Sequence, residues 1–273
     1  MLLALVRSSH PGPTAAVTAI TFALAWGYGL ESWRVAAVTV AILANQLSVG
    51  LSNDWLDSAR DRASGRTDKP IASGELSTGL VAGVALGLAA ASILLSFVLG
   101  PWSALAHAIF LASGWAYNLG IKSTLASVVP YVAGFGSLPA IVTLSTATPQ
   151  LAAMWAITAG ALLGVAAHFT NVLPDLDDDS QTGVRGLPHA LGARLSAAVI
   201  AASLIGASVA VVFGPAAPPS ALSLSGFVAT IVIAGLSVTL IVQGKLHRLL
   251  FRLTIAAAAI TAALLVLSAP ELT

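Results

Sequence analysis

The chain has 273 residues, of which 57% are hydrophobic and only 8% are charged, and its mean hydropathy is +0.92. Soluble domains carry about 25% charged residues, so this composition excludes an ordinary soluble protein and predicts an integral membrane protein. Cysteine is absent, which excludes disulfides, thiolate nucleophiles and cysteine-ligated zinc or iron–sulfur centres. The formal net charge of +1 identifies no partner, and the sequence predicts neither a nucleic-acid partner nor a particular protein partner.

The apolar segments are about 20 residues long and lack strict in–out alternation, which favours membrane-spanning helices. Residues 1–13 are too short, and too polar at their end, to predict a cleaved secretory signal. Nine spans are predicted, at about 14–31, 35–53, 77–99, 102–120, 125–144, 151–173, 195–214, 222–243 and 253–269. We therefore expect an all-α bundle of nine transmembrane helices with cytoplasmic loop caps, forming a single domain over residues 1–273.

The Lys and Arg residues predict the orientation of this bundle. With nine spans, eleven of the twelve cationic residues fall on one side of the membrane, and only Arg34 falls on the other. The positive-inside rule makes the cation-rich side cytoplasmic. We expect a multi-pass protein of the inner or plasma membrane, if the source is bacterial, with its site facing the cytoplasm.

Two acidic clusters share the spacing Asn-x3-Asp-x3-Asp. The first is Asn53, Asp57 and Asp61, and the second is Asn171, Asp175 and Asp179. With Asp54, Asp177 and Asp178, the clusters hold seven of the eleven acidic residues. Residues four apart share one face of a helix, so each cluster is expected to present a column of oxygen ligands of the kind that Mg²⁺ prefers.

The clusters are 118 residues apart, which corresponds to four spans. This offset suggests a parallel repeat of spans 1–4 and 5–8, with the ninth span left over. In the second cluster, Asp178 shares the face of Asp175, whereas Asp177 points away from it. Pro174 favours the start of a new helix, which would take Asn171 out of the second column.

Carboxylate columns beside cations suit a diphosphate bridged by Mg²⁺, because the metal binds the carboxylates and Lys or Arg binds the remaining oxygens. Lys69, Lys122 and Arg185 lie close to the clusters in the sequence and are candidate diphosphate contacts. The alternative is that the clusters are solvated helix ends. Gln46 and His168 continue the two polar stripes into the membrane, where each either forms an interhelical hydrogen bond or faces a substrate.

The chain resembles the UbiA superfamily of intramembrane prenyltransferases in three places. NDWLDSARD, followed by RTDKPIASGELS, is similar to the family's NDxxDxxxD motif, with Asn53, Asp54, Asp57 and Asp61 in the motif positions. Asp175 and Asp179, followed by TGVRGLPHALG, resemble the second motif, DxxxD. YNLGIKS places Tyr117 and Lys122 where the family has Tyr and Lys.

The resemblance implies nine transmembrane helices, a Mg²⁺ cofactor and a prenyl diphosphate substrate. It implies metal binding by Asp54, Asp57, Asp61, Asp175 and Asp179, with Asp57, Asp61, Asp175 and Asp179 catalytic. We also expect Asp178 to bind metal, because it shares the face of Asp175. The resemblance implies substrate binding by Asn53, Lys69, Tyr117, Lys122, Asn171 and Arg185. The predicted function is transfer of a prenyl group to an aromatic or quinone precursor, or to a lipid, within the membrane. A membrane terpene cyclase of the same superfamily and a cation transporter are the alternatives.

Overall fold

The computed structural model describes residues 1–176, 183–243 and 248–273, and every regular element in these ranges is a helix. The α-helices are α1 (Leu2–Ser8), α2 (Pro11–Gly27), α3 (Ser32–Ala63), α4 (Thr78–Leu99), α5 (Pro101–Asn118), α6 (Val129–Thr143), α7 (Met154–Val172), α9 (Leu187–Phe213), α10 (Ala221–Val242) and α11 (Arg248–Leu267). Short 3-10 helices are η1 (Ile121–Ser123), η2 (Leu173–Asp175) and η3 (Ala269–Glu271). The prediction of an all-α protein is confirmed for the described ranges.

Each of the nine predicted spans overlaps one of the helices α2 to α7 and α9 to α11. In the described part of the chain, five helices are long and apolar enough to cross a membrane: α3, α4, α7, α9 and α10. α6 and α11 contain shorter apolar helices. The count of nine spans and the four-span repeat therefore stay predictions.

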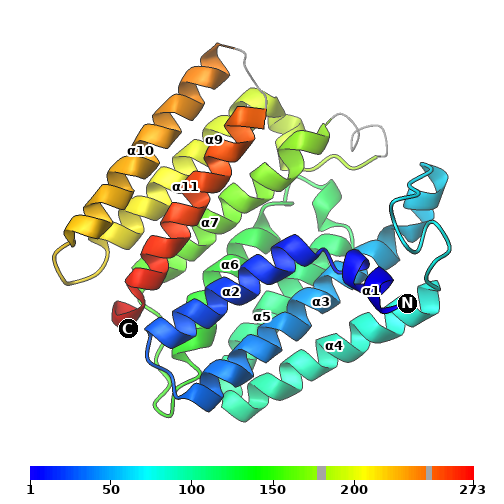
Figure 1. Cartoon of the computed structure of the whole chain (residues 1–273), viewed down its shortest axis with the longest axis horizontal. Coiled ribbons are helices and arrows are strands. Elements are labelled where there is room, and N and C mark those ends of the chain that lie inside the picture. Colours follow the sequence, from blue (N-terminus) through cyan, green and yellow to red (C-terminus); the bar gives the residue numbers. More distant parts are fainter. Residues whose placement is uncertain (177–182, 244–247) are drawn as a thin grey trace.

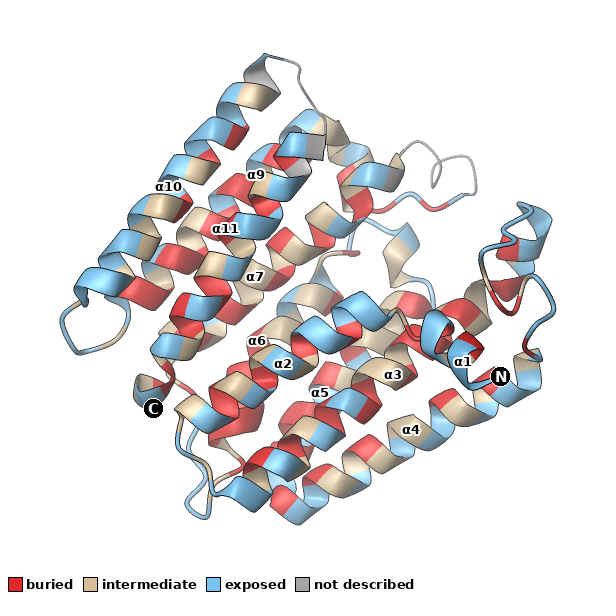
Figure 2. Ribbon diagram, in the orientation of Figure 1, coloured by how far each residue is buried: buried red, intermediate tan, exposed pale blue. Residues whose placement is uncertain are grey.

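Successive helices lie side by side in the bundle (Figure 1). α3 packs against α2 and α4, α6 packs against α5 and α7, and α9 packs against α7 and α10. α11 then returns to contact α2 and α7, so the last helix closes against the first long one. Figure 2 shows the consequence for burial: α4 and α10 present exposed outer faces, whereas α3 and α9 are more buried.

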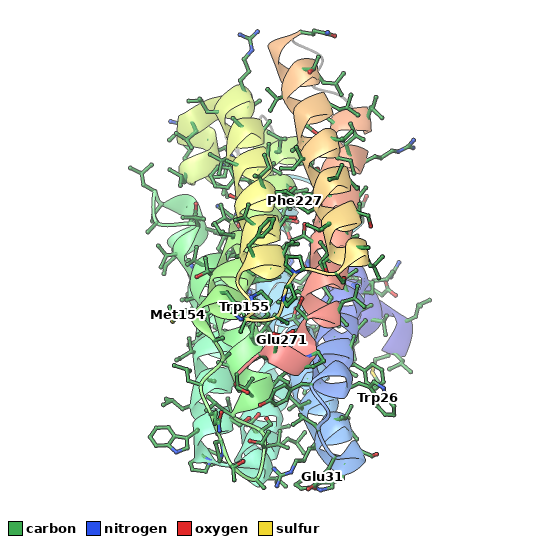
Figure 3. The ribbon with its side chains drawn as sticks, turned by 90° about the vertical axis from the view of Figure 1, so that its left-hand side faces the viewer. Trp26, Glu31, Met154, Trp155, Phe227 and Glu271 are labelled. Carbon is green, nitrogen blue, oxygen red and sulfur yellow. The ribbon has the colours of Figure 1, made fainter. Side chains whose placement is uncertain are left out.

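Local sequence explains several of the helix ends. The Ser77 hydroxyl accepts a hydrogen bond from the Leu80 amide at 3.3 Å and caps the start of α4. Gly100 ends α4 with a φ of 126°, and Pro101 occupies the first turn of α5, where its missing N–H costs no helical bond. Near the C-terminus, the Leu272 carbonyl accepts a hydrogen bond of 2.6 Å from the amide of Ala153, the residue before α7. Figure 3 labels Trp155 and Glu271, which lie close to these two residues in the sequence.

The structure corrects one predicted boundary near the acidic clusters and agrees with the other. α3 does not end near residue 53 but continues to Ala63, so the first cluster lies on one unbroken helix. α7 ends at Val172 and tightens into η2 at Pro174. Asn171 stays inside α7 whereas Asp175 lies in η2, so the two do not form a column on one helix, as Pro174 led us to expect.

Helices α6 and α7 approach each other closely because α7 carries glycines on the facing side. A Cβ atom on Gly164 would lie 2.3 Å from the Tyr131 carbonyl oxygen, and one on Gly160 would lie 2.4 Å from the Phe135 carbonyl oxygen. Real Cβ atoms do not come this close to a carbonyl oxygen, so the contact requires glycine. This packing fixes where Tyr131 and Phe135 of α6 lie.

Candidate functional site

A cavity of about 220 Å³ lies between α2, α3, α5, α6 and α7. Its polar lining residues include Tyr117, Asn118 and Asn171, each in the last turn of its helix. Asn53 also lines it and lies two to three turns before the end of α3. Val17, Phe110 and Phe135 line it farther along the helices, toward the bundle interior. The cavity is therefore polar near the acidic cluster of α3 and apolar beyond it.

Asp57 forms the centre of a polar network at the polar end. Lys122 Nζ donates to both carboxylate oxygens of Asp57 at 2.6 Å, and Arg60 lies 2.8 Å away. Asn53 Nδ2 donates to Asp57 Oδ2 and to Asn118 Oδ1, at 3.2 Å each. Burial lowers the pKa of the Lys122 ammonium below its usual value, and the facing Asp57 partly offsets this effect. The structure thus brings Lys122 to the predicted residues Asn53 and Asp57, although Lys122 and Asp57 are 65 residues apart in the sequence.

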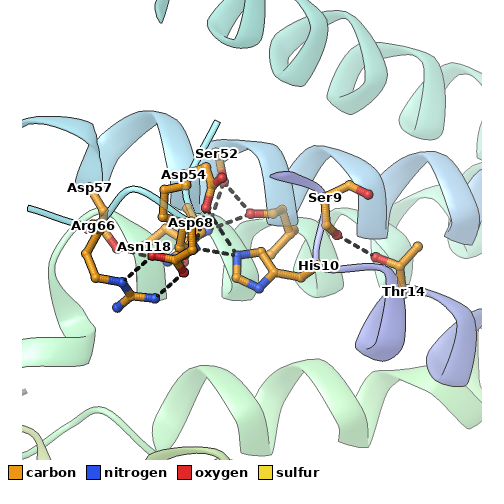
Figure 4. A network of polar contacts seen from close by, with 12 residues as sticks. Ser9, His10, Thr14, Ser52, Asp54, Asp57, Arg66, Asp68 and Asn118 are labelled. Atoms are coloured by element: carbon orange, nitrogen blue, oxygen red, sulfur yellow. Dashed lines mark hydrogen bonds and ion pairs between the residues drawn. The ribbon is translucent and has the colours of Figure 1, made fainter. Parts of the chain in front are cut away.

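Asp54 points to a different set of nitrogen atoms (Figure 4). Its Oδ1 atom accepts a hydrogen bond from Lys69 Nζ at 2.6 Å and lies 3.4 Å from His10 Nε2. Its Oδ2 atom is buried and has no hydrogen-bond partner among the described residues. A buried carboxylate oxygen without a partner costs free energy, and a divalent cation with oxygen ligands would satisfy it. The donor set around α3 therefore fits a magnesium ion.

The other acidic residues of the site differ in how far the structure describes them. Asp61 is buried, at 6% exposure, whereas Asp68 is a loop residue whose pKa the Arg66 guanidinium lowers to about 2. Asp175 ends η2, but its side chain, together with Asp178 and Asp179, lies outside the described residues. Within the described part, no three acidic or histidine side chains converge on one point. The predicted metal ligands therefore stay predictions.

The predicted substrate-binding residues are partly assembled. Asn53, Tyr117 and Asn171 line the cavity. Lys69 and Lys122 do not line it, but their partners Asp54 and Asp57 lie next to the lining residues His10 and Asn53, and we call this charged border the mouth of the cavity. Arg185 is exposed, in the segment that precedes α9. The structure thus brings five of the six residues to one place, and their roles stay predictions.

Aromatic rings surround the cavity on the side of α5 and α6. The Tyr117 and Tyr131 rings meet edge to face with centroids 5.2 Å apart, and Phe135 stacks on Tyr131 at 6.1 Å. His168 Nε2 lies 3.0 Å from the Oγ atom of Ser127, which belongs to the turn before α6, so this contact joins α7 to a turn and not to another helix. Gln46 lines the cavity, which agrees with a substrate-facing role.

Sequence reasoning missed Asn118, which lines the cavity and accepts a hydrogen bond from Asn53, and it also missed His10. The case of His10 is the more instructive. His10 precedes the first long helix and lines the cavity next to Asp54 and Lys69. A histidine ahead of Pro11 carries no recognisable spacing, because its place depends on a contact with α3 about 40 residues away. The signal that could have found it is weak: one ionisable group in a short polar link between two apolar segments.

Fold and site together define a class of protein: a helical membrane protein with an internal cavity that has charged groups at its mouth and apolar walls inside. The sequence pattern of the UbiA prenyltransferase family matches residues 14–259, and the chain belongs to this family. It is therefore a prenyltransferase, as the sequence predicted.

Three proteins illustrate the similarity. The "Bacteriochlorophyll synthase 33 kDa chain" of Cereibacter sphaeroides is 27% identical over 186 residues, which span 61% of this chain and 58% of that relative. The protein of the same name from Rhodobacter capsulatus is 25% identical over 237 residues, 76% of each chain. The structure of a UbiA homologue from Archaeoglobus fulgidus bound to GPP and Mg²⁺ superposes with a TM-score of 0.72, at 12% identity, over 97% of this chain and 99% of that one.

Proposed function

We propose that this prenyltransferase uses Mg²⁺ to transfer a prenyl group from an allylic polyprenyl diphosphate to an acceptor within the membrane. The observation that carries the proposal is the cavity: its lining residues Asn53 and His10 contact carboxylate–ammonium pairs at the mouth, and its other walls are largely apolar and aromatic. A prenyl diphosphate has the same division, with a charged head and a hydrocarbon tail. We further propose that residues 1–273 form one domain and that the cavity mouth faces the cytoplasm.

The metal would be held by carboxylates of both clusters. In the first cluster these are Asp54, Asp57 and Asp61, and in the second they are Asp175, Asp178 and Asp179. Bound Mg²⁺ would stabilise the negative charge that develops on the departing diphosphate. Support comes from the unpartnered Asp54 Oδ2 and from the A. fulgidus homologue, whose structure contains GPP and Mg²⁺.

The cations of the site would exchange partners when substrate binds. Lys122 and Lys69 neutralise Asp57 and Asp54 in the structure. A magnesium diphosphate supplies the opposite charge to each partner, so the lysines, with Arg185, would bind phosphate oxygens while the aspartates bind metal. Asn53 and Asn171 would donate hydrogen bonds to the same head group. Because charge is replaced by charge, this exchange avoids leaving a buried ion unpaired.

The apolar part of the cavity would hold the prenyl tail and exclude water. The allylic C–O bond breaks with its electron pair leaving on the diphosphate oxygen, and the acceptor nucleophile bonds to the allylic carbon and loses a proton to solvent. Water would intercept the allylic cation, so dry walls protect the transfer. Tyr117, whose ring lines the cavity, would present a π face to this cation.

Turnover of purified protein tests the proposal. With Mg²⁺, an allylic diphosphate should release diphosphate efficiently only when an acceptor is present, and the acceptor panel should include aromatic and quinone precursors, membrane lipids and, because of the named relatives, bacteriochlorophyll precursors. Acceptor-free conversion to a cyclic product would show a cyclase instead. Full activity of both Asp57→Ala and Asp175→Ala would overturn the proposal, because it assigns both residues to the metal.

A further inference from the structure

The link between α1 and α2 rests directly on α3 at the mouth of the cavity. A Cβ atom on Gly50 would lie 2.2 Å from the Ser9 carbonyl oxygen, so only glycine at position 50 allows this approach. Ser9 is buried, and the Thr14 hydroxyl donates to its carbonyl at 2.9 Å (Figure 4). The link is therefore held in place one turn before Asn53, by contacts that leave little freedom to its neighbour His10.

His10 has an unusual backbone conformation. It is the one described residue other than glycine with a positive φ, at 52° with ψ of 67°. The left-handed region costs an L-residue about 1–2 kcal/mol, and such conformations persist where the surrounding structure imposes them, often at functional sites. Here the result is that the imidazole lines the cavity.

The imidazole of His10 also lacks a short hydrogen bond. Its Nε2 atom lies 3.4 Å from Asp54 Oδ1 and 3.4 Å from Lys69 Nζ, whereas charge-assisted bonds are usually about 2.7–2.9 Å long. The side chain is 41% exposed. The histidines inside the bundle differ, because His107 and His168 lie 2.6 Å and 3.0 Å from serine hydroxyls. Within the described part of the chain, His10 has, unlike His107 and His168, no short hydrogen bond that holds its ring, so the ring can turn to a ligand at the mouth.

We propose that His10 binds the diphosphate of the donor substrate, donating from Nε2 next to the Lys69 ammonium, and that Gly50 is the positioning residue that places it there. The inference rests on the proposed function and adds a contact that the sequence motifs do not contain. It requires no change of protonation, because a neutral imidazole carries one N–H donor.

Equilibrium binding of inorganic pyrophosphate with Mg²⁺ to the purified full-length chain tests this assignment. A hydrogen bond to a charged group contributes about 1.5–3 kcal/mol, so His10→Ala is expected to weaken the affinity about tenfold or more. His10→Gln keeps an N–H donor and should recover most of that loss. Wild-type affinity in His10→Ala, or equal weakening by Ala and Gln, would overturn the assignment.

Gly50→Ala tests the positioning role with the His10 side chain intact, and Gly12→Ala is its matched control. An added Cβ at Gly12 meets no atom within 4 Å, so this variant should bind as wild type. Gly50→Ala should weaken Mg²⁺–pyrophosphate binding about tenfold and raise KM for the donor more than it lowers kcat. Wild-type affinity in Gly50→Ala would overturn the positioning role.

The two proposals fail in different ways. If wild-type protein bound no Mg²⁺–pyrophosphate, the proposed function would fail, and His10 with it. If wild type bound and His10→Ala bound equally well, only the role of His10 would fail. A purely structural role for His10 would lower the thermal unfolding temperature and leave the affinity of the folded protein unchanged, which contradicts the proposal. Should Gly50→Ala not fold, the His10→Ala and His10→Gln pair still decides.

Discussion

The two ends of the bundle both bury polar groups, but they do so differently. At the cavity mouth, Asp57 and Asp54 pair with lysines next to open space. At the opposite end, Arg34 donates to the Ser145 carbonyl at 2.8 Å, and the Ser145 and Ser103 hydroxyls lie 2.8 Å apart. The first arrangement offers charges of both signs to a ligand, whereas the second consists mainly of short bonds between protein atoms and lines neither described cavity. Buried polar groups alone therefore do not indicate a binding site. Ion pairs that lie beside a cavity, where a ligand can replace one of the partners, do.

The largest expected effect comes from removing Asp57. Asp57→Ala should lower kcat/KM for transfer by about a thousandfold or more, since each 1.36 kcal/mol of lost transition-state stabilisation is tenfold in rate and metal ions supply several kcal/mol. It should also destabilise the fold by about 3–5 kcal/mol, because Lys122 is left buried without its partner. Steady-state kinetics and thermal unfolding in detergent measure the two effects.

A double variant separates these two effects. Asp57→Leu with Lys122→Met removes both charges and should recover most of the lost stability, as apolar replacements of buried ion pairs usually do. It should remain inactive, because neither metal nor diphosphate finds its ligand. Recovery of activity along with stability would show that the pair serves only the fold.

A smaller effect is expected where helix packing shapes the apolar walls. Gly164→Ala should destabilise the fold by about 1–3 kcal/mol and lower kcat/KM about tenfold, because its Cβ would push α6 away and move Tyr131. Gly87→Ala on α4 is the matched control, because an added Cβ there meets no atom within 4 Å. It should lower neither the stability nor kcat/KM. An unaffected Gly164→Ala would show that this contact does not shape the cavity.

The smallest effect on activity is expected at the opposite end. Ser145→Ala removes the hydroxyl contact with Ser103 and should cost about 1 kcal/mol of stability, with kcat/KM within about twofold of wild type. Thermal unfolding and the transfer assay check both values. A loss of activity as large as that of Gly164→Ala would mean that the two ends are energetically coupled and that the contrast between them is too simple.

Local spacing predicted the parts of the site that depend on one helix. Asn53, Asp57 and Asp61 share a face because they are four residues apart on α3, and the motif resemblance also pointed to Lys122, which the structure pairs with Asp57. The hydropathy pattern located every long helix but placed the end of α3 too early. The apolar residues of α3 stop near residue 53, whereas the polar residues that follow remain helical up to Ala63.

Features that depend on contacts between distant segments could not be predicted. The position of His10 follows from the absence of a side chain at Gly50, which no pattern around either residue reveals. The break in the second column, in contrast, was predicted locally: η2 replaces the α-helix after Val172, since Pro174 has no amide hydrogen to continue it. Identical spacing in sequence thus produced different backbones.

The most direct test of the central claim is an experimental structure of the protein with Mg²⁺ and a non-hydrolysable allylic thiodiphosphate. The account predicts a diphosphate between the Asp57 and Lys122 side chains, metal on the carboxylates, and the hydrocarbon tail running past Tyr117 toward Phe110 in the cavity between α3 and α5. Binding of the analogue elsewhere, with the Asp57–Lys122 pair still closed, would contradict it.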